Sequence, residues 1–145
     1  MTEFRRVTEE FWASPQIEPT DVEEARQRGF ALIVNNRPDD ESPGQPRDEE
    51  IAAAVAAAGL AYRAIPVTPG GFDRGHVDAM TKALQEAGGP VLAFCRSGTR
   101  STLLWALAEA GRGRSVEAIA ADAAGAGYDI APVRALMERL APGRD

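Results

Sequence analysis

The sequence predicts a single α/β domain, residues 1–145, with a central, mainly parallel sheet of about four to five strands flanked by helices. Three observations predict this fold. A chain of 145 residues has the usual size of one domain. Short apolar runs alternate along it with stretches of helical composition, and glycine stands near the end of these stretches. Strands joined by helical crossovers run parallel and are covered on both faces.

The first two thirds of the chain contain three steps from a helix to a strand. Each helix is expected to begin at polar or acidic residues and to end at or just before a glycine. Residues Thr20–Glu23 are expected to form a capping box. The expected helices run from Thr20 to Gly29, from Asp48 to Gly59 and from Asp73 to Ala87, and the strands that follow them are residues 30–34, 60–67 and 91–94.

The ends of the chain complete the predicted domain. The segment 4–13 is expected to add edge strands. After Cys95 the sequence predicts helices at 100–110, which ends at Gly111, at 115–126, which begins at Ser115, and at 132–140, which begins at Pro132.

Composition disfavours several classes of partner. With 16 Lys and Arg against 22 Asp and Glu, the net charge of −6 disfavours nucleic acid, because phosphate contacts dominate that affinity. No apolar run approaches the roughly 20 residues that span a bilayer, and residues 1–6 lack the apolar stretch of a secretion signal. We therefore expect a cytoplasmic protein with no membrane partner. The single cysteine and the lack of metal-ligand spacings predict no metal and no other cofactor.

Three loops are expected to leave the carboxyl ends of the strands at one edge of the sheet. They are residues 35–41, 68–71 and 95–100. Open parallel sheets bind their ligands at this edge. The sequence therefore predicts a functional site formed by these loops.

The loop that begins at Cys95 and ends at Arg100 is the strongest functional signal in the sequence. Its backbone amides and the helix that follows favour an anion. Such surroundings lower the pKa of a cysteine from about 8.5 to about 3.5–7.5 and make it a nucleophile. Arg100 can hold an anion through two parallel hydrogen bonds, and Ser101 can donate to the Cys95 thiolate or cap the helix. The other loop residues expected to bind the anion are Arg96, Ser97, Gly98 and Thr99.

The loop after the first apolar strand offers further candidates. Arg37 can guide an anionic substrate. Asp39 can act as an acid or orient Arg100, and Asp40 and Glu41 can do the same. A plain solvated turn is the alternative interpretation of these acidic residues.

Several segments together carry a family resemblance. They are Gln16 with the helix at Thr20, Gly29-Phe30, Asn36-Arg37-Pro38-Asp39, Ile65-Pro66-Val67-Thr68 and Cys95-Arg96-Ser97-Gly98-Thr99-Arg100-Ser101. Over nearly the whole chain they resemble the phosphatase-like domain of beta-lactamase-hydrolase-like proteins. That family is similar in fold to protein tyrosine and dual-specificity phosphatases, which implies Cys95 as nucleophile and Arg100 as anion clamp. Its members also occur joined to persulfide-handling metallo-hydrolase domains, which implies sulfur chemistry and a functional partnership with such a hydrolase.

The sequence departs from the phosphatase pattern in two ways. Phosphatases of this fold count seven residues from the cysteine to the arginine, whereas Cys95 to Arg100 is six, which resembles the Cys-Arg-Ser-Gly-x-Arg loop of single-domain rhodaneses. Dual-specificity phosphatases also carry an acid close after the strand that resembles Ile65–Val67, where this chain has Thr68 and Pro69.

Both departures favour a cysteine-dependent sulfurtransferase that carries a persulfide on Cys95. Its partners would be a small anionic sulfane-sulfur donor and a thiol acceptor, because the chain has no second cysteine to accept the sulfur. One alternative is a tyrosine or dual-specificity type phosphatase that acts on a phosphoester through a cysteinyl-phosphate. Another is a non-catalytic, anion-binding regulatory domain.

Overall fold

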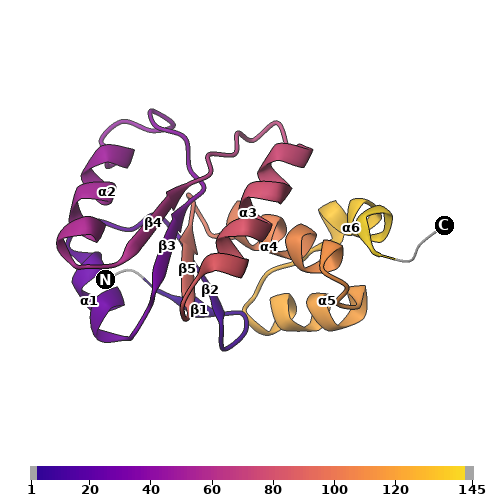
Figure 1. Ribbon diagram of the computed structural model, residues 1–145. Helices are drawn as coiled ribbons and strands as arrows, with labels where there is room; N and C mark the ends of the chain where they lie inside the picture. Colours follow the sequence, from indigo (N-terminus) through magenta and orange to yellow (C-terminus); the bar gives the residue numbers. More distant parts are fainter. Residues whose placement is uncertain (1–2, 143–145) are drawn as a thin grey trace.

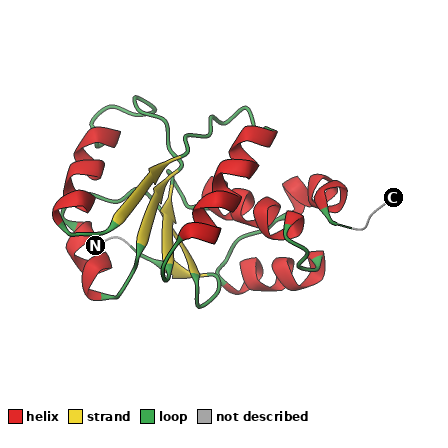
Figure 2. Ribbon diagram, in the orientation of Figure 1, coloured by secondary structure: helices red, strands yellow, loops and turns green. Residues whose placement is uncertain are grey.

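The central sheet has the strand order β1-β2-β5-β3-β4 in the computed structural model, which describes residues 3–142 (Figures 1 and 2). Strands β2, β5, β3 and β4 run parallel, and β1 pairs antiparallel with β2. The predicted mainly parallel sheet is therefore confirmed. The strands are β1 (Arg5–Arg6), β2 (Phe11–Ser14), β3 (Leu32–Asn35), β4 (Ala61–Ala64) and β5 (Val91–Phe94).

Helices cover both faces of the sheet. Figure 1 shows α1 and α2 on one side and α3 to α6 on the other. The helices are α1 (Asp21–Gln27), α2 (Asp48–Ala57), α3 (Arg74–Glu86), α4 (Thr99–Gly111), α5 (Val116–Gly125) and α6 (Arg134–Leu140), with the short 3-10 helix η1 (Ala131–Val133) directly before α6. Within residues 3–142, no helix is both long and apolar enough to cross a membrane.

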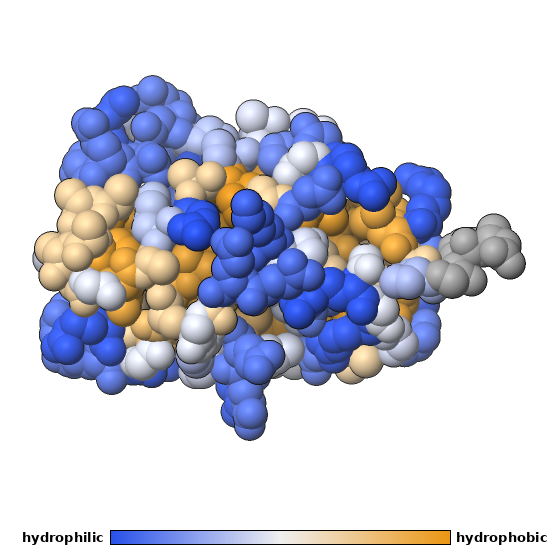
Figure 3. Space-filling view, viewed as in Figure 1, coloured by the Kyte–Doolittle hydropathy of each residue, from blue (hydrophilic) through white to orange (hydrophobic). Residues whose placement is uncertain are grey.

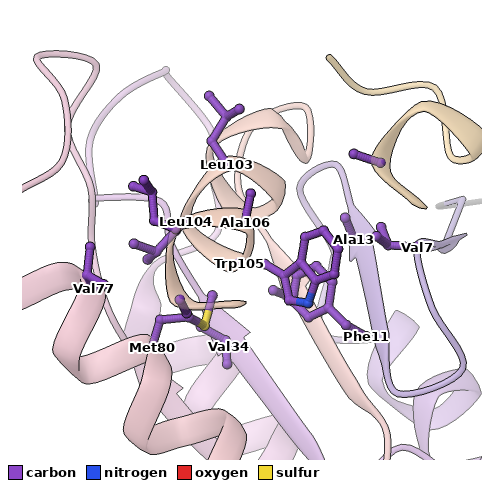
Figure 4. Packing of buried hydrophobic residues seen from close by; sticks show 14 of the residues in the cluster. Val7, Phe11, Ala13, Val34, Val77, Met80, Leu103, Leu104, Trp105 and Ala106 are labelled. Carbon is purple, nitrogen blue, oxygen red and sulfur yellow. The ribbon is translucent and has the colours of Figure 1, made fainter. Parts of the chain in front are cut away.

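Successive side chains of the inner strands point to opposite faces and build two cores. In β3, Ile33 packs into the core beneath α1 and α2, whereas Leu32 and Val34 pack into the core beneath α3 and α4. Trp105 of α4 stacks on Phe11 of β2, with ring centroids 5.3 Å apart and an interplanar angle of 9° (Figure 4). These contacts hold α4 firmly, and with it the loop that leads from β5 into this helix.

Strand β2 lies inside the sheet, so the expectation that the N-terminal segment supplies only edge strands is wrong for β2. It pairs with β1 on one side and β5 on the other, and β1 is the edge strand. Phe11 is 1% exposed, and Ala13 and Ser14 are fully buried. Both faces of β2 are covered, so its four residues show no alternation of polar and apolar side chains. The sequence pattern therefore could not indicate that β2 lies inside the sheet.

The capping box predicted at Thr20 is also wrong. Thr20 has helical backbone angles, φ −69° and ψ −22°, and its side chain makes no capping hydrogen bond. The carboxylate of Asp21 instead accepts the amide of Glu18 at 2.7 Å. The turn 18–21 therefore starts α1 without a hydroxyl cap.

The three predicted loops meet at the carboxyl edge of the sheet. The amide of Asn36 donates to the carbonyl of Phe94 at 2.8 Å, and the amide of Val67 donates to the carbonyl of Asn36 at 2.9 Å. These bonds join the ends of β5, β3 and the chain after β4. The loop after β3 thus lies between the Cys95 loop and the loop at Thr68.

Candidate active site

Cys95 directly follows β5 and is fully buried. Its Sγ accepts the amide N–H of Gly98 at 3.1 Å, so the loop curls back over the sulfur. Gly98 makes this possible because it has a φ of 92°, a conformation that side chains disfavour. Helix α4 begins at the next residue, Thr99. The predicted strand, cysteine, glycine turn and helix are all present.

The loop presents free backbone donors around the sulfur. Within residues 3–142, the amides of Arg96, Ser97, Arg100 and Ser101 have no hydrogen-bond acceptor. They lie at the N-terminus of α4, where the helix dipole adds positive potential. The side chains of Ser97 and Thr99 are exposed and bond to each other, Oγ to Oγ1, at 3.0 Å. The arrangement favours a small anion next to Cys95.

Arg100 is held by a two-point ion pair with Glu41. Nη1 donates to Oε2 at 2.7 Å and Nη2 donates to Oε1 at 2.8 Å, while Nη1 also donates to the carbonyl of Val67 at 2.6 Å. A guanidinium has five N–H donors. Among residues 3–142, no hydrogen bond engages the remaining Nε–H and Nη2–H, which lie on the same edge of the group. That edge can hold two oxygens of an anion.

Glu41 lies between two guanidinium groups. Its Oε1 also accepts Nε of Arg37 at 2.9 Å. The hydrogen bond from Arg100, supported by Arg37, lowers the pKa of Glu41 from 4.5 to about 2, although burial opposes the change. The same pair raises the pKa of Arg100, to which the charge of Cys95 also contributes. Glu41 is therefore ionised at neutral pH and orients Arg100 rather than donating a proton.

Asp39, predicted as a catalytic residue, is not brought to the cysteine loop. Its Oδ1 accepts the amide of Asp48 at 2.8 Å at the start of α2, and its Oδ2 lies 3.6 Å from Nη2 of Arg47. Asp40, between Asp39 and Glu41, has a φ of 66°. This left-handed residue turns the chain, so Asp39 serves α2 and Glu41 reaches Arg100.

Arg37 is engaged in the fold, which argues against the predicted role as a substrate guide. The residue is 6% exposed. Its Nε, Nη1 and Nη2 donate to Glu41, Gln16 and Ser42 at 2.9, 3.1 and 3.0 Å. Arg37 therefore acts on the anion clamp indirectly, by fixing Glu41.

Two of the predicted site residues, Ser101 and Arg96, have side chains without a hydrogen-bond or ion-pair partner among residues 3–142. The Ser101 Oγ is buried and has no hydrogen-bond partner among residues 3–142, so the structure shows neither the predicted bond to Cys95 nor the predicted cap. The Oδ1 of Asn36 is the other buried side-chain atom of this kind. Arg96 is exposed, and no hydrogen bond or ion pair of the described residues holds its guanidinium. It is free to meet an incoming anion.

Tyr128 also belongs to the site, although it was not among the residues that the sequence predicted there. Its hydroxyl donates to the carbonyl of Ser97 at 3.2 Å. A Cβ on Gly98 would lie 2.1 Å from the Tyr128 hydroxyl oxygen. Burial raises the pKa of Tyr128, and the charge of Cys95 adds to the shift. Tyr128 packs against the cysteine loop from 31 residues away, a contact that no local pattern signals.

The donor set of the site suits an anion. It consists of a thiol, guanidinium groups and backbone amides. In the part of the chain that the structure describes, no group of three or more His, Cys, Asp and Glu side chains could hold a metal ion.

The comparisons with known proteins agree with this geometry. Residues 3–112 match the family model described as beta-lactamase hydrolase-like protein, phosphatase-like domain. The chain belongs to this family. A beta-lactamase hydrolase-like protein of Agrobacterium fabrum is 38% identical over 109 residues, which are 75% of this chain and 25% of the relative. One of Xylella fastidiosa strain 9a5c is 37% identical over 119 residues, 79% of this chain and 27% of the relative. The chain thus spans about a quarter of these relatives.

Solved structures place this phosphatase-like domain among known phosphatase folds. A candidate phosphatase from Neisseria meningitidis Z2491 has a TM-score of 0.81 and 32% identity, over 94% of this chain and 96% of that one. The kinase-associated phosphatase has a TM-score of 0.72 and 16% identity, over 99% of this chain and 97% of that one, which shows the fold alone.

These matches confirm the predicted family and the tyrosine-phosphatase-like fold. They support the phosphatase alternative more than the leading hypothesis of sulfur transfer, which none of them tests. The beta-lactamase hydrolase-like phosphatase-like domain is thus a cysteine-loop domain of phosphatase fold.

Proposed function

We propose that this domain is a sulfurtransferase in which Cys95 accepts a sulfane sulfur from a small anionic donor and passes it to a thiol. The ionisation of Glu41 carries the proposal. Its pKa of about 2 leaves the carboxylate nearest the anion clamp without a proton to give. Cleavage of a phosphate ester is helped by an acid that protonates the leaving oxygen. Sulfite leaves thiosulfate as a stable anion and requires no such acid.

The other candidate acids at this edge of the sheet are also occupied. Asp39 accepts the amide of Asp48. Asp73 caps α3 by accepting the amide of His76 at 2.9 Å, and its side chain is 72% exposed. The chain after β4 carries Thr68 and Pro69 where the dual-specificity phosphatases that the family resembles have their acid. This arrangement favours a reaction without proton donation to the leaving group.

The proposed reaction balances without an external oxidant or reductant. The Cys95 thiolate attacks the outer sulfur of thiosulfate, so that a new S–S bond forms while the S–S bond of the donor breaks. The electron pair of the broken bond leaves with sulfite. An acceptor thiolate then attacks the outer sulfur of the protonated persulfide, releasing an acceptor persulfide and the Cys95 thiolate.

The residues around Cys95 have distinct tasks in this scheme. The free edge of Arg100 and the open amides of the loop hold the oxygens of the donor. Because Cys95 is fully buried under Gly98, the turn 96–98 has to move off the sulfur before attack. The unpaired hydroxyl of Ser101 can then donate to the thiolate in place of the Gly98 amide.

The test is intact-protein mass spectrometry after incubation with thiosulfate. We expect the wild type to gain one sulfur atom that excess thiol removes, and Cys95→Ser to gain none. Cys95→Ser should keep the fold, because serine fits the volume of the buried cysteine. A wild type that gains no sulfur from thiosulfate or from a glutathione persulfide would contradict the proposal.

A phosphatase is the second candidate, and the similarity to solved phosphatases favours it. Here Cys95 would attack phosphorus, the ester oxygen would leave with a proton from solvent, and water would hydrolyse the cysteinyl-phosphate. This reaction predicts hydrolysis of aryl phosphates, whose leaving groups need little protonation, and none by Cys95→Ser. Turnover of an aryl phosphate with no sulfur on Cys95 would establish this candidate instead.

The thiol acceptor and the metallo-hydrolase partner are predictions. A thiol outside this chain would take the sulfur, because Cys95 is the chain's one cysteine. The metallo-hydrolase partnership implied by the family resemblance fits the same direction of transfer, since such an enzyme would consume the persulfide formed. Copurification and sulfur transfer to such a hydrolase would test it.

A further inference from the structure

An apolar cleft of about 380 Å³ lies beside Arg100. Its walls are the loop after β4, the first turns of α4, and the segment formed by η1 and α6. The apolar side chains that line it are Phe72, Leu103, Val133 and Leu136. Leu103 points away from the core residues Met80 and Trp105 (Figure 4), and hydrophobic surface is visible beside α6 toward the start of α3 (Figure 3).

Arg100 connects this cleft to the cysteine loop. It is the one charged residue among the described residues that line the cleft, and the guanidinium edge that Glu41 leaves open can bind an anion. A ligand whose anionic group lies at Arg100 would therefore have an adjoining group in apolar surroundings. An inorganic ion such as thiosulfate occupies only the charged part of this combined site.

The size and walls of the cleft suit a small molecule. Pockets for small ligands measure roughly 300–1,000 Å³. Peptides often bind by adding a strand to a sheet edge. The edge strands β1 and β4 do not line this cleft, whose walls are a loop and helices. The cleft wall formed by η1 and α6 contributes Pro132, Val133 and Leu136. This wall lies outside residues 3–112, the part of the chain that matches the family model.

We propose that this cleft binds the apolar group of an organic anion, so that the preferred donor is an aryl or alkyl thiosulfonate or a persulfide with an apolar substituent. The thiosulfonate identity of the anion rests on the proposed function. The apolar preference rests on the cleft alone and holds for any anion bound at Arg100.

Titration calorimetry with two unreactive monoanions, benzenesulfonate and methanesulfonate, tests the preference without any reaction. The wild type should bind benzenesulfonate about tenfold more tightly, because the ring leaves water for the cleft. Leu136→Thr and Phe72→Ser should remove most of this preference and leave the Kd of methanesulfonate unchanged within about twofold. Leu140→Thr is the matched control, since Leu140 is also half-buried on α6 but does not line the cleft. Thermal unfolding of each variant verifies that it is folded.

The outcomes separate the two proposals. Equal Kd values for the two anions in the wild type, or a preference that Leu136→Thr and Phe72→Ser both retain, would overturn the cleft inference. If the preference follows the cleft while Cys95 gains no sulfur from any donor, the sulfurtransferase fails and the cleft inference stands. If Cys95 gains sulfur but the preference is absent, only the cleft inference fails.

Discussion

Glu41 and Arg100, 59 residues apart in the chain, form a two-point ion pair with N–O distances of 2.7 and 2.8 Å. The pair leaves the Nε edge of Arg100 free and is backed by Arg37, which is buried. Its side chains are only 16% and 17% exposed, so solvent screens it weakly. The anion clamp is thus oriented before any substrate arrives.

The first prediction concerns Glu41→Gln. Loss of the charge leaves two enclosed guanidinium groups poorly paired, so the free energy of unfolding should fall by about 2 kcal/mol in denaturant titrations. The misaligned Arg100 should lower kcat/KM by about 100-fold, with most of the loss in KM for the anionic donor. Glu9→Gln, whose carboxylate is 86% exposed, is the control and should change the unfolding free energy by less than about 0.5 kcal/mol. Equal behaviour of the two variants would contradict the role of Glu41.

The second prediction concerns pH. The folded-state pKa of Glu41 is about 2 against an ordinary 4.5, so between these values the unfolded state binds more protons and stability rises with pH. A pKa lowered from 4.5 to about 2 corresponds to about 3 kcal/mol of stability above pH 4.5, and this contribution should disappear as the pH falls toward 2. The difference in unfolding free energy between wild type and Glu41→Gln should shrink over the same window. A difference independent of pH would show that charge is not its cause.

The third prediction concerns the loop glycine. Gly98→Ala should be less stable than the wild type because of its φ of 92° and a Cβ only 2.1 Å from the Tyr128 hydroxyl. Gly113→Ala controls for backbone strain alone, since Gly113 has a φ of 103° and open space around its Cβ position. We expect Gly98→Ala to cost at least about 1 kcal/mol more in chemical denaturation, and Tyr128→Phe to recover part of this excess in the double variant. If Gly98→Ala and Gly113→Ala lose the same unfolding free energy, the close packing of Tyr128 on the loop does not contribute to stability.

The fourth prediction concerns Arg96. Its exposed, unpaired guanidinium should attract the donor without holding the fold, so Arg96→Ala should raise KM about threefold to tenfold at low salt with unchanged stability. The effect should fade in high salt, because mobile ions screen exposed charges. Arg139→Ala removes another exposed arginine, from the end of α6, and should leave KM unchanged. A salt-independent change would assign Arg96 a direct contact with the reacting group.

Most of the fold could be predicted because its signals are local. Gly29 and Gly59, expected to stop the first two helices, have φ values of 86° and 80° and directly follow the C-cap residues of α1 and α2. The central place of β2 could not be predicted in this way. It depends on pairing with β5, 80 residues further along the chain.

The same division applies to the site. Cys95, Gly98 and Arg100 lie within six consecutive residues, so their roles follow from one motif. The sequence could not choose among the adjacent acids Asp39, Asp40 and Glu41, because the turn at φ 66° decides which of them reaches Arg100. The contact of Tyr128 with the loop depends equally on tertiary packing.

The most direct measurement compares two reactions in one enzyme preparation. The value of kcat/KM for sulfite release from thiosulfate with a thiol acceptor is set against that for hydrolysis of an aryl phosphate, with Cys95→Ser as the blank for both. The Glu41 geometry predicts that sulfite release exceeds phosphate hydrolysis by at least about 100-fold and that Cys95→Ser abolishes it. Faster hydrolysis of the phosphate, with no Cys95-dependent sulfite, would contradict sulfur transfer and establish the domain as a phosphatase.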